Sequence, residues 1–598
     1  MLMTVIKLLQ TDHMPDSDAN ASVRGNARAV ARTDRMPNSD TGADAAVAFV
    51  TRSDITADAP AGITPSSQQA DPHHAAERAL SHAPTPPGSE IELKLIVDAG
   101  KLADFDDAPV IKAHARNKGT RRHLKSVYYD TRKRVLWRNG LSLRVRQVGT
   151  RFVQTVKLQE TDNPLGRGEW EAAVPSLTPD LALAMPFIPE KLRAGLTQDK
   201  LESVFVSDIH RHQRLLDLHS GTVEVAFDHG TLTAGERTQA VDEIELELKG
   251  GSTVAIYEIA QRLAEHGSLR PSIHAKSARG FDLDGGRSPG AGKPHKLRLD
   301  PAVSLDESFS AVLRGCFRHL LQAIPSAEDG RNPEGVHQLR VSLRRLRAVL
   351  QLMQSLGDWA KLESLRSDAR WLAQSLSAAR DWDVFQADTL PAVARGCPSI
   401  GGFDALDEIA QRHRATAYRR IRTALADRRC TMFLLSLGEW IETRGWRSDV
   451  SPQTLGELAL PAVDFAGQVL EARHAKVLKR GRHFKSLTAA RRHELRIALK
   501  KLRYSADFLL PLYGDRKSAR KYARRLAGLQ EKLGCYNDMA TTMALLSGLD
   551  AESTDGAIAA AAITGWQARA MDGAEAPLRK AWRAFTEAVP PWTAASET

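Results

Sequence analysis

Cysteines and long apolar runs are both scarce in this sequence of 598 residues, and these absences exclude several classes of protein. The four cysteines lie far apart and form no C-x-x-C motif, so neither a cysteine zinc site nor a redox pair is expected. Two disulfides could form in principle, but reduced thiols in a cytoplasmic protein are the simpler expectation. No run of eighteen apolar residues occurs, and the first nine residues lack the features of a signal peptide. We therefore predict no transmembrane helix and no cleaved leader.

The composition is otherwise that of an ordinary globular protein, with 42% hydrophobic and 26% charged residues. A chain of this length is too long for a single core, so we expect two or three domains. The net charge of +11 favours an acidic partner. Nucleic acid, a membrane surface and polyphosphate all qualify on charge alone.

Residues 1–87 are rich in Ala, Asp, Ser, Thr and Pro and show no sustained periodicity. Such a segment buries too little apolar surface to offset the entropy of ordering, so we expect a disordered N-terminal extension. The alternative is an upstream extension of the reading frame that adds nothing to function. Glycine, proline and basic residues over 284–301 predict a linker, and residues 591–598 are expected to form a tail.

Residues 90–97 alternate charged and apolar side chains with a period of two, which predicts a β-strand. Glu90, Glu92 and Lys94 share one face of this strand. The charged face could be solvated, or it could line a wet interior as inward residues do in a closed sheet. Residues 243–249 repeat the alternation with three glutamates on one face, which favours the second interpretation.

Basic strands lie between these two acidic strands. Residues 142–146 and 153–157 place arginine and lysine on one face, and Glu169 and Glu171 follow two apart. Rows of like charge are costly unless they are solvated or matched by partners. Carboxylates suit hard divalent cations, and arginine binds phosphate oxygens in a bidentate manner. The sheet is therefore predicted to bind a metal-bound polyanion.

The E-x-E-x-K motif at Glu90 to Lys94 resembles the signature of the CYTH family, the triphosphate tunnel metalloenzymes. Further matches follow in the family's order: Tyr128-Tyr129-Asp130-Thr131, Arg144 and Arg146, Thr155-Val156-Lys157, Glu169 and Glu171, Asp228-His229-Gly230, the run from Glu243, and Ile273-His274-Ala275-Lys276-Ser277. The resemblance covers residues 88–283. It implies an antiparallel eight-stranded β-tunnel that hydrolyses triphosphates with Mg²⁺ or Mn²⁺.

The resemblance, together with the charge pattern, assigns roles within this domain. The metal candidates are Glu90, Glu92, Glu243 and Glu245, followed by Glu169, Glu171 and Glu247, which could equally pair with nearby basic residues. The triphosphate candidates are Lys94, Arg144, Arg146, Lys157, Arg211, Arg214 and Lys276. We expect Lys94 and Lys276 to act in catalysis, and Asp228 to orient a basic residue instead of touching metal. A metal would neutralise phosphate charge and activate the attacking water.

From residue 302 onward the pattern becomes helical and contains an internal repeat. The segment from His337 to Arg347 returns from His493 to Arg503, a shift of 156 residues, and Asp381 returns as Asp538 after 157. On a helical projection, each copy gathers basic residues on one face and leucines on the other. A solvated face normally mixes charge signs, whereas this face carries no acid, so we predict an anion-binding surface.

This repeat resembles the CHAD domain, a helical family of two pseudo-symmetric halves that is associated with polyphosphate binding. The sequence therefore predicts an α+β multidomain protein, in which a β-tunnel precedes an all-α helical-bundle domain over 302–590 with halves at 302–455 and 456–590. We name the predicted anion-binding residues of the two copies the basic stripes. They are His337, Arg340, Arg344 and Arg347, and then His493, Arg496, Lys500 and Arg503.

Inorganic triphosphate is the favoured substrate, because the CHAD-like half indicates a polyphosphate context and no base-stacking signature favours a nucleotide. The expected partners are thus inorganic triphosphate and polyphosphate, with no membrane and no nucleic acid, since aromatic residues do not interleave the stripes. Thiamine or nucleoside triphosphatase, adenylate cyclase, and a non-catalytic polyphosphate-binding protein stay open. The oligomeric state is left open as well.

Overall fold

The structure is a computed structural model. It describes residues 91–158, 168–295, 297, 299–357, 359–448, 450–514, 516–547, 549 and 554–593. Residues 87–598 belong to one compact unit. Glu90 and the predicted N-terminal extension, 1–87, lie outside the described residues.

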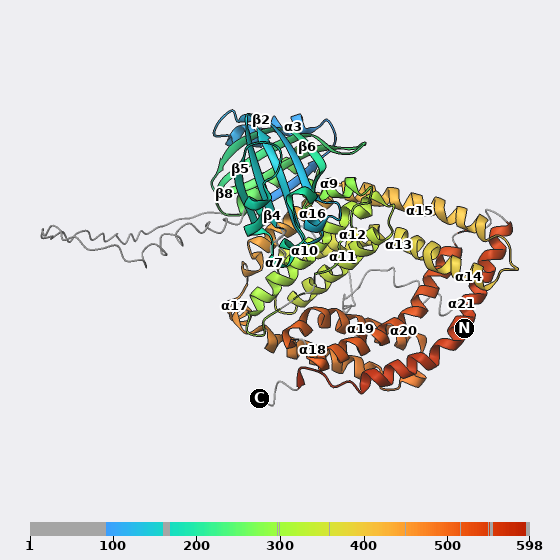
Figure 1. The fold of residues 1–598 in the computed structure, drawn as a ribbon. Helices are drawn as coiled ribbons and strands as arrows, with labels where there is room; N and C mark the ends of the chain where they lie inside the picture. Colours follow the sequence, from blue (N-terminus) through green and yellow to red (C-terminus); the bar gives the residue numbers. More distant parts are fainter. Residues whose placement is uncertain are drawn as a thin grey trace, which may run out of the picture. The chain divides into compact units, whose positions relative to one another are not determined.

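The first half is built on a curved antiparallel sheet, whose strands Figure 1 shows in blue to green. The order across the sheet is β5-β4-β3-β2-β6-β7-β8-β1-β9. The strands are β1 (Glu92–Val97), β2 (Thr120–Thr131), β3 (Leu141–Val148), β4 (Arg151–Leu158), β5 (Gly168–Val174), β6 (Leu201–Leu218), β7 (Gly221–Ala234), β8 (Arg237–Gly251) and β9 (Leu269–Ser272). The described residues thus form nine strands. This is one strand more than the eight expected, and the additional strand is the short β9, which pairs with β1.

The strands predicted from alternation are confirmed, as β1, β3, β4 and β8 span the expected segments. Gly149, at φ 62°, makes the tight turn between β3 and β4, where a side chain would be strained. Short helices connect the strands: α3 (Leu102–Asp106), α4 (Pro109–His114), α5 (Val135–Arg138), α6 (Leu181–Ala184), α7 (Glu190–Arg193), α8 (Val254–His266) and α9 (Lys276–Asp284).

The apolar face of β1 and β8 is covered by α8. Leu93, Leu95 and Leu246 are at most 1% exposed and belong to one cluster with Ile256 and Ile259 of that helix. The burial of this face sends the alternate residues of both strands, which are charged, to the other side of the sheet.

Helix α9 packs on the charged side of the sheet, against β6, β7 and β8. Phe281 is buried and meets the ring of Phe205 edge-on. Gly280 lies directly over that ring, because a Cβ there would come within 2.1 Å of it. This close approach fixes the helix and hence the position of Lys276 at its start.

The second half is helical, as predicted, and its helices run from green to red in Figure 1. They are α10 (Leu305–Asp329), α11 (Glu334–Met353), α12 (Ala360–Ser375), α13 (Ser377–Val384), α14 (Leu390–Gly396), α15 (Phe403–Ala426), α16 (Arg428–Glu442), α17 (Pro452–Ala459), α18 (Ala462–Arg480), α19 (Ala489–Leu509), α20 (Lys517–Ser547) and α21 (Thr554–Thr586). Among the described residues, no helix combines the length and the apolar character that a membrane crossing requires.

Two helix pairs reflect the sequence repeat. Helix α10 packs on α11, and α18 packs on α19. Helix α18 begins 157 residues after α10, and α19 begins 155 residues after α11, as the first residues of the four helices give. These offsets match the shift in the sequence, so each copy of the stripe lies on the second helix of an equivalent pair.

Candidate active site and anion-binding surface

The charged face of the sheet brings together residues from β1, β6, β7 and β8. The register sets Lys94 opposite Glu245, Asp228 opposite Glu243, and Arg211 opposite Asp228. Asp228 and Glu243 are fully buried. We call these five residues, with Glu92 and with Lys276 and Arg279 of α9, the carboxylate cluster.

Two lysines lie among the carboxylates of this cluster. The Lys276 ammonium donates to Asp228 at 2.6 Å and to Glu245 at 3.0 Å, and it also contacts Glu243. Lys94, 4% exposed, donates to Glu92 and Glu245. The structure therefore brings together both predicted catalytic lysines and three of the predicted metal ligands.

Two arginines complete the cluster. Arg211 binds Asp228 through two bonds of 2.7 and 2.6 Å and also contacts Glu245. Asp228 thus contacts two basic residues, Arg211 and Lys276. Arg279 donates to Glu243 at 2.8 Å and was missed by sequence reasoning, although it lies three residues after Lys276 on the same helical face.

The protonation states in the cluster are mutually stabilised. Burial disfavours every charge there, but Asp228, Glu243 and Glu245 outweigh it and raise the pKa of Lys276. Burial is outweighed in the same way at Glu245, where Lys276 and Lys94 hold the pKa well below its usual range. At neutral pH Asp228 and Glu245 are therefore ionised and Lys276 is cationic.

A basic row occupies β3 and β4 on the same face. Arg144 is 8% exposed and lies opposite Thr155, whose hydroxyl donates to Glu171 at 3.1 Å. Arg146 donates to Ser126 at 3.1 Å. Burial, and then the charge of Arg144, lower the pKa of Arg146 to about 10. At Arg146, burial and the neighbouring arginine thus outweigh the opposing charges of Tyr128 and Glu245.

Tyr128 is a further residue of this row that sequence reasoning did not assign to the site. It stands opposite Arg144 in the register of β2 and β3 and is 4% exposed. Burial raises the pKa of Tyr128, but Arg144 and Arg146 outweigh it and lower the pKa below the usual value. The sequence contains Tyr128 within the motif Tyr128-Tyr129-Asp130-Thr131. The register of β2 with β3 was needed to show that it lies beside Arg144.

Some predicted residues are not in the cluster. Arg214 lies on the opposite face of β6, where it contacts Asp106 of α3 at 3.0 Å, since it is an odd number of residues from Arg211. Glu247 lies on the charged face but pairs with Lys249 at 2.6 Å. Lys157 shares the face of Arg144. The Glu169 side chain lies outside the described residues, like Glu90.

Asp228, Glu243 and Glu245 offer carboxylate oxygens within 4.8 Å of one another. Hard cations such as Mg²⁺ and Mn²⁺ prefer this donor set, and Asp228 and Glu243 are shielded from solvent. The residues therefore fit a divalent metal. Lys94 contacts Glu245 and Lys276 contacts all three carboxylates, so a metal held there would compete with these lysines for carboxylate oxygens.

In the helical half, the prediction that the leucines opposite the stripes form the core is confirmed. The exposed fraction is 0% for each of these leucines, which are Leu339, Leu343, Leu346, Leu350, Leu495, Leu499 and Leu502. Within the stripes, Arg340 donates to Ser377 of α13 at 2.8 Å. Arg344 of α11 lies over the ring of Tyr504 of α19, 5.6 Å from its centroid.

Residues of both stripes surround Tyr504. Burial raises the pKa of Tyr504, while Arg344 of α11 and Arg496 of α19 lower it. The repeated aspartates also lie near the stripes: Asp381 raises the pKa of Arg340 against burial, and Arg496 and Lys500 lower the pKa of Asp538 against burial. The two stripes thus meet on one surface, with an acidic residue beside each. The remaining stripe residues are half-buried, and Arg503 pairs with Asp507 at 2.9 Å.

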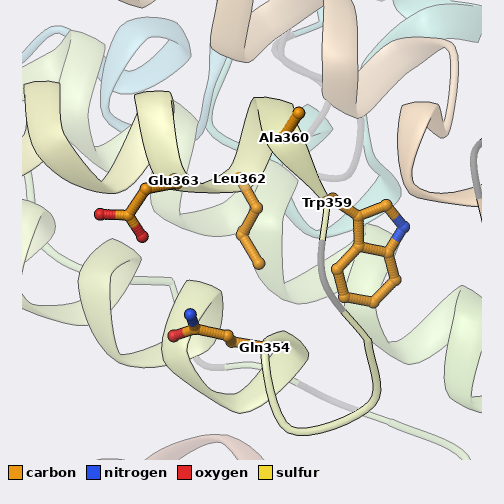
Figure 2. A pocket seen from close by; sticks show the side chains of 5 residues that line it. All are labelled: Gln354, Trp359, Ala360, Leu362 and Glu363. Carbon is orange, nitrogen blue, oxygen red and sulfur yellow. The ribbon is translucent and has the colours of Figure 1, made fainter. Parts of the chain in front are cut away.

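A separate pocket of about 320 Å³ lies where α12 begins. Figure 2 shows its lining side chains, Gln354, Trp359, Ala360, Leu362 and Glu363. None of them belongs to the stripes or to the carboxylate cluster. Gln354 and Glu363 both accept from Arg366, and Trp359 donates to a backbone oxygen, which accounts for their polar groups structurally.

A curved antiparallel sheet with a buried face of mixed charge, joined to a duplicated helical domain, defines the class of this protein. The family model of the CYTH domain matches residues 88–281, and that of the CHAD domain matches residues 311–547. The chain is therefore a protein with a CYTH domain followed by a CHAD domain. CYTH enzymes are metal-dependent and have triphosphatase or adenylate-cyclase-like activities.

The similarity to individual proteins is more distant. An inorganic triphosphatase of Haemophilus influenzae is 28% identical over 163 residues, which is 27% of this chain and 46% of that protein. The chain thus matches less than half of that relative. An uncharacterised protein of Mycobacterium tuberculosis is 26% identical over 64% of this chain and 75% of its own. The solved CHAD domain of the plant Ricinus communis is 32% identical, covers 48% of this chain and 96% of its own, and has a TM-score of 0.42.

Proposed function

We propose that the CYTH domain hydrolyses inorganic triphosphate to diphosphate and phosphate, and that the CHAD domain binds polyphosphate. The observation that carries the first part is the single charged face on which carboxylates and a basic row lie together. A triphosphate requires both, because its negative charge must be matched and its metal ion must be held. The distant similarity to an inorganic triphosphatase supports this choice of substrate.

The residues divide into two groups. Asp228, Glu243 and Glu245 hold the metal, and Arg144 and Arg146 hold the phosphate chain. A bound Mg²⁺ or Mn²⁺ neutralises phosphate charge and lowers the pKa of a coordinated water. Lys276 is best placed to act together with the metal-holding and the phosphate-holding residues. Its ammonium contacts all three carboxylates and lies at the end of a flexible side chain.

The contacts of Lys276 suggest how the ligand-free site is kept ready. Without a ligand, its ammonium compensates buried carboxylates that would otherwise be uncompensated. With a metal held by the same carboxylates, Lys276 would no longer be needed for that compensation and could donate to a phosphate oxygen. The same exchange applies to Lys94, which contacts Glu92 and Glu245. Both lysines are therefore proposed to bind phosphate only in the presence of metal.

A specific observation favours polyphosphate for the second domain. The stripes of α11 and α19 meet around Tyr504, so they offer one continuous basic surface and not two separate ones. A linear polyanion matches such a surface at successive phosphates. Its binding is expected to weaken with salt, because neutralised phosphates release their counterions.

The test is phosphate release from a panel of inorganic triphosphate, thiamine triphosphate, ATP and GTP, each with Mg²⁺ and with Mn²⁺. Inorganic triphosphate is expected to give the highest kcat/KM. A nucleotide or thiamine ester that is hydrolysed faster would overturn the proposed substrate. Formation of cyclic AMP would identify a cyclase, and the absence of any turnover would favour a protein that only binds.

A further inference from the structure

A row of histidines crosses the outer face of the sheet. The register places His123 of β2 opposite His210 of β6, and His210 opposite His229 of β7, which in turn lies opposite Asp242 of β8. Because successive residues alternate faces, His210 points away from the side on which its neighbour Arg211 enters the carboxylate cluster. This row is therefore separate from the proposed active site and plays no part in its chemistry.

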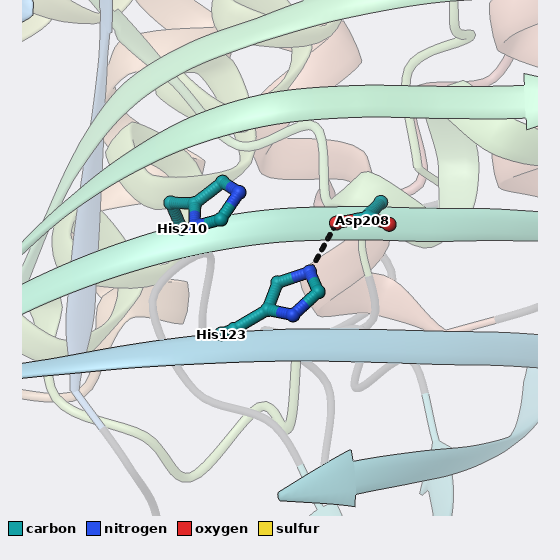
Figure 3. A group of neighbouring side chains, drawn as sticks. All are labelled: His123, Asp208 and His210. Carbon is teal, nitrogen blue, oxygen red and sulfur yellow. Dashed lines mark hydrogen bonds and ion pairs between the residues drawn. The ribbon is translucent and has the colours of Figure 1, made fainter. Parts of the chain in front are cut away.

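Three side chains of this region converge, as Figure 3 shows. His123 Nε2 lies 2.5 Å from Asp208 Oδ1, and the His123 and His210 rings are stacked with centroids 4.6 Å apart. Each of the three offers a ligand atom within 4.8 Å of the others. Both histidines are exposed and Asp208 is partly exposed, so an ion can reach them from solvent.

We propose that His123, Asp208 and His210 form a binding site for a divalent transition-metal ion, with Zn²⁺ as the type case. Two imidazole nitrogens and one carboxylate oxygen are a donor set that such ions accept, with water completing the coordination. Mg²⁺ and Ca²⁺ prefer all-oxygen ligands, so this site differs in selectivity from the carboxylate cluster. A hydrogen bond between His123 and Asp208 would be exchanged for two metal bonds.

Two neighbouring residues, Lys125 and His229, bear on the affinity of this site for a metal ion. Lys125 lies opposite Asp208 in the register and shares its face, so its charge opposes a bound cation. His229, next to His210, is held by Asp242 at 2.6 Å and is therefore the natural comparison: an exposed histidine of the same row that already has its own carboxylate. We expect it to contribute nothing to the affinity.

The ligands come from two strands, and this gives the site a structural consequence. His123 belongs to β2, whereas Asp208 and His210 belong to β6, so a bound ion links the two strands. Strand β6 also carries Arg211, which is bonded to Asp228 and Glu245 on the inner face. Binding to the folded state alone raises its stability, so Zn²⁺ is expected to raise the melting temperature.

The experiment is a calorimetric titration of the full-length protein with Zn²⁺ in excess Mg²⁺, which occupies the carboxylate cluster. Parallel titrations with Co²⁺ follow the visible absorption that a low-symmetry nitrogen-ligated site produces. His123→Ala, His210→Ala and Asp208→Asn are each expected to weaken one site by about 10- to 100-fold, the loss found even for outer partners of metal ligands. The same variants should lose the rise in melting temperature.

The control variants decide the assignment. His229→Ala should leave both titrations unchanged, and Lys125→Gln should tighten the site. If His229→Ala lowers the affinity as much as His123→Ala does, the row binds metal diffusely and the assignment fails. It also fails if the three ligand variants, shown to be folded by their melting in the absence of Zn²⁺, titrate like the parent protein.

Discussion

The carboxylate cluster and the basic stripes both concentrate charge in half-buried surroundings, but their pKa values move in opposite directions. In the cluster, carboxylates outweigh burial and raise the pKa of Lys276. In the stripes, burial lowers the pKa of Arg340 despite the opposing charge of Asp381, and burial and Arg380 lower that of His337. In the cluster the opposite charges thus outweigh burial at Lys276, whereas at Arg340 and His337 burial outweighs the nearby acids.

In the direction of its pKa shift, the basic row of β3 and β4 resembles the stripes and not the cluster, although it lies in the same domain as the cluster. Burial and Arg144 lower the pKa of Arg146 to about 10. A lowered pKa on a buried cation therefore marks both places where we propose that phosphate binds. The raised pKa of Lys276 marks the place where we propose that a metal replaces an ammonium.

The largest effect is expected at the centre of the cluster. Glu245→Gln removes a carboxylate that contacts Lys94, Arg211 and Lys276 together, with little change of shape. We expect turnover of triphosphate to fall on the order of 10²–10³-fold, as when one preorganised catalytic group is removed. Phosphate release in saturating Mg²⁺ measures this loss. Circular dichroism should still report a folded protein.

The matched control for this change is Glu224→Gln. Glu224 shares the charged face but lies opposite Glu247, beyond the cluster, and it should retain parental turnover. Equal losses in the two variants would mean that the whole acidic face, and not the cluster, supports activity. Parental turnover in Glu245→Gln would remove that residue from the metal site.

The next effect concerns the stripes. Changing Arg340, Arg344, Arg496 and Lys500 together to Gln is expected to weaken binding of long-chain polyphosphate by about 10²-fold or more at low salt. The logarithmic salt dependence should also become shallower by about 0.7 for each lost phosphate contact, if polyphosphate behaves like a single strand. Fluorescence anisotropy of labelled polyphosphate at several salt concentrations measures both. The leucine core is untouched, so helical content should remain.

A control variant with the same change in net charge separates a site from general attraction. Lys361, Arg395, Arg428 and Lys476 are exposed and lie on four other helices. Their joint change to Gln should lower the affinity much less. If both quadruple variants lose affinity equally, or if the parent binds DNA as tightly as polyphosphate, the stripes are only part of a general basic surface.

Period and alternation were sufficient to predict the strands, the buried leucines and most of the charged face. Arg214 was predicted to bind triphosphate together with Arg211, but alternation contradicts this. The two residues are three apart, an odd separation, which places their side chains on opposite faces of a strand. Arg279 and Tyr128 needed tertiary information. The first depends on how α9 packs on the sheet, and the second depends on the pairing of β2 with β3.

A smaller effect should appear at Arg146. Because burial disfavours its charge, Arg146→Met is expected to stabilise the ligand-free protein, and a gain of about 1 kcal/mol would raise the melting temperature by about 2–4 °C. The same change should weaken triphosphate binding by about 10- to 100-fold, since a charge-assisted bond is lost. Scanning calorimetry with and without triphosphate measures both. Exposed Arg151, at the start of the neighbouring strand β4, is the control, and a lower melting temperature in Arg146→Met would contradict the comparison.

The smallest effect is a pH dependence that originates at His337. Burial, and then Arg380, lower the pKa of its imidazole below 6.5, while Glu334 raises it only in part. The free protein therefore keeps His337 neutral at pH 7, and the protonated form costs stability as the pH falls. A bound polyanion raises the pKa again, so binding takes up a proton, and the affinity for polyphosphate should rise as the pH falls from 7 to 5. The rise is limited to about tenfold for each pKa unit of the shift.

His337→Gln should flatten this profile, whereas His483→Gln, at an exposed histidine of the same domain, should not. An unchanged profile in His337→Gln would show that the proton is taken up elsewhere, and that His337 does not take part in binding the polyanion.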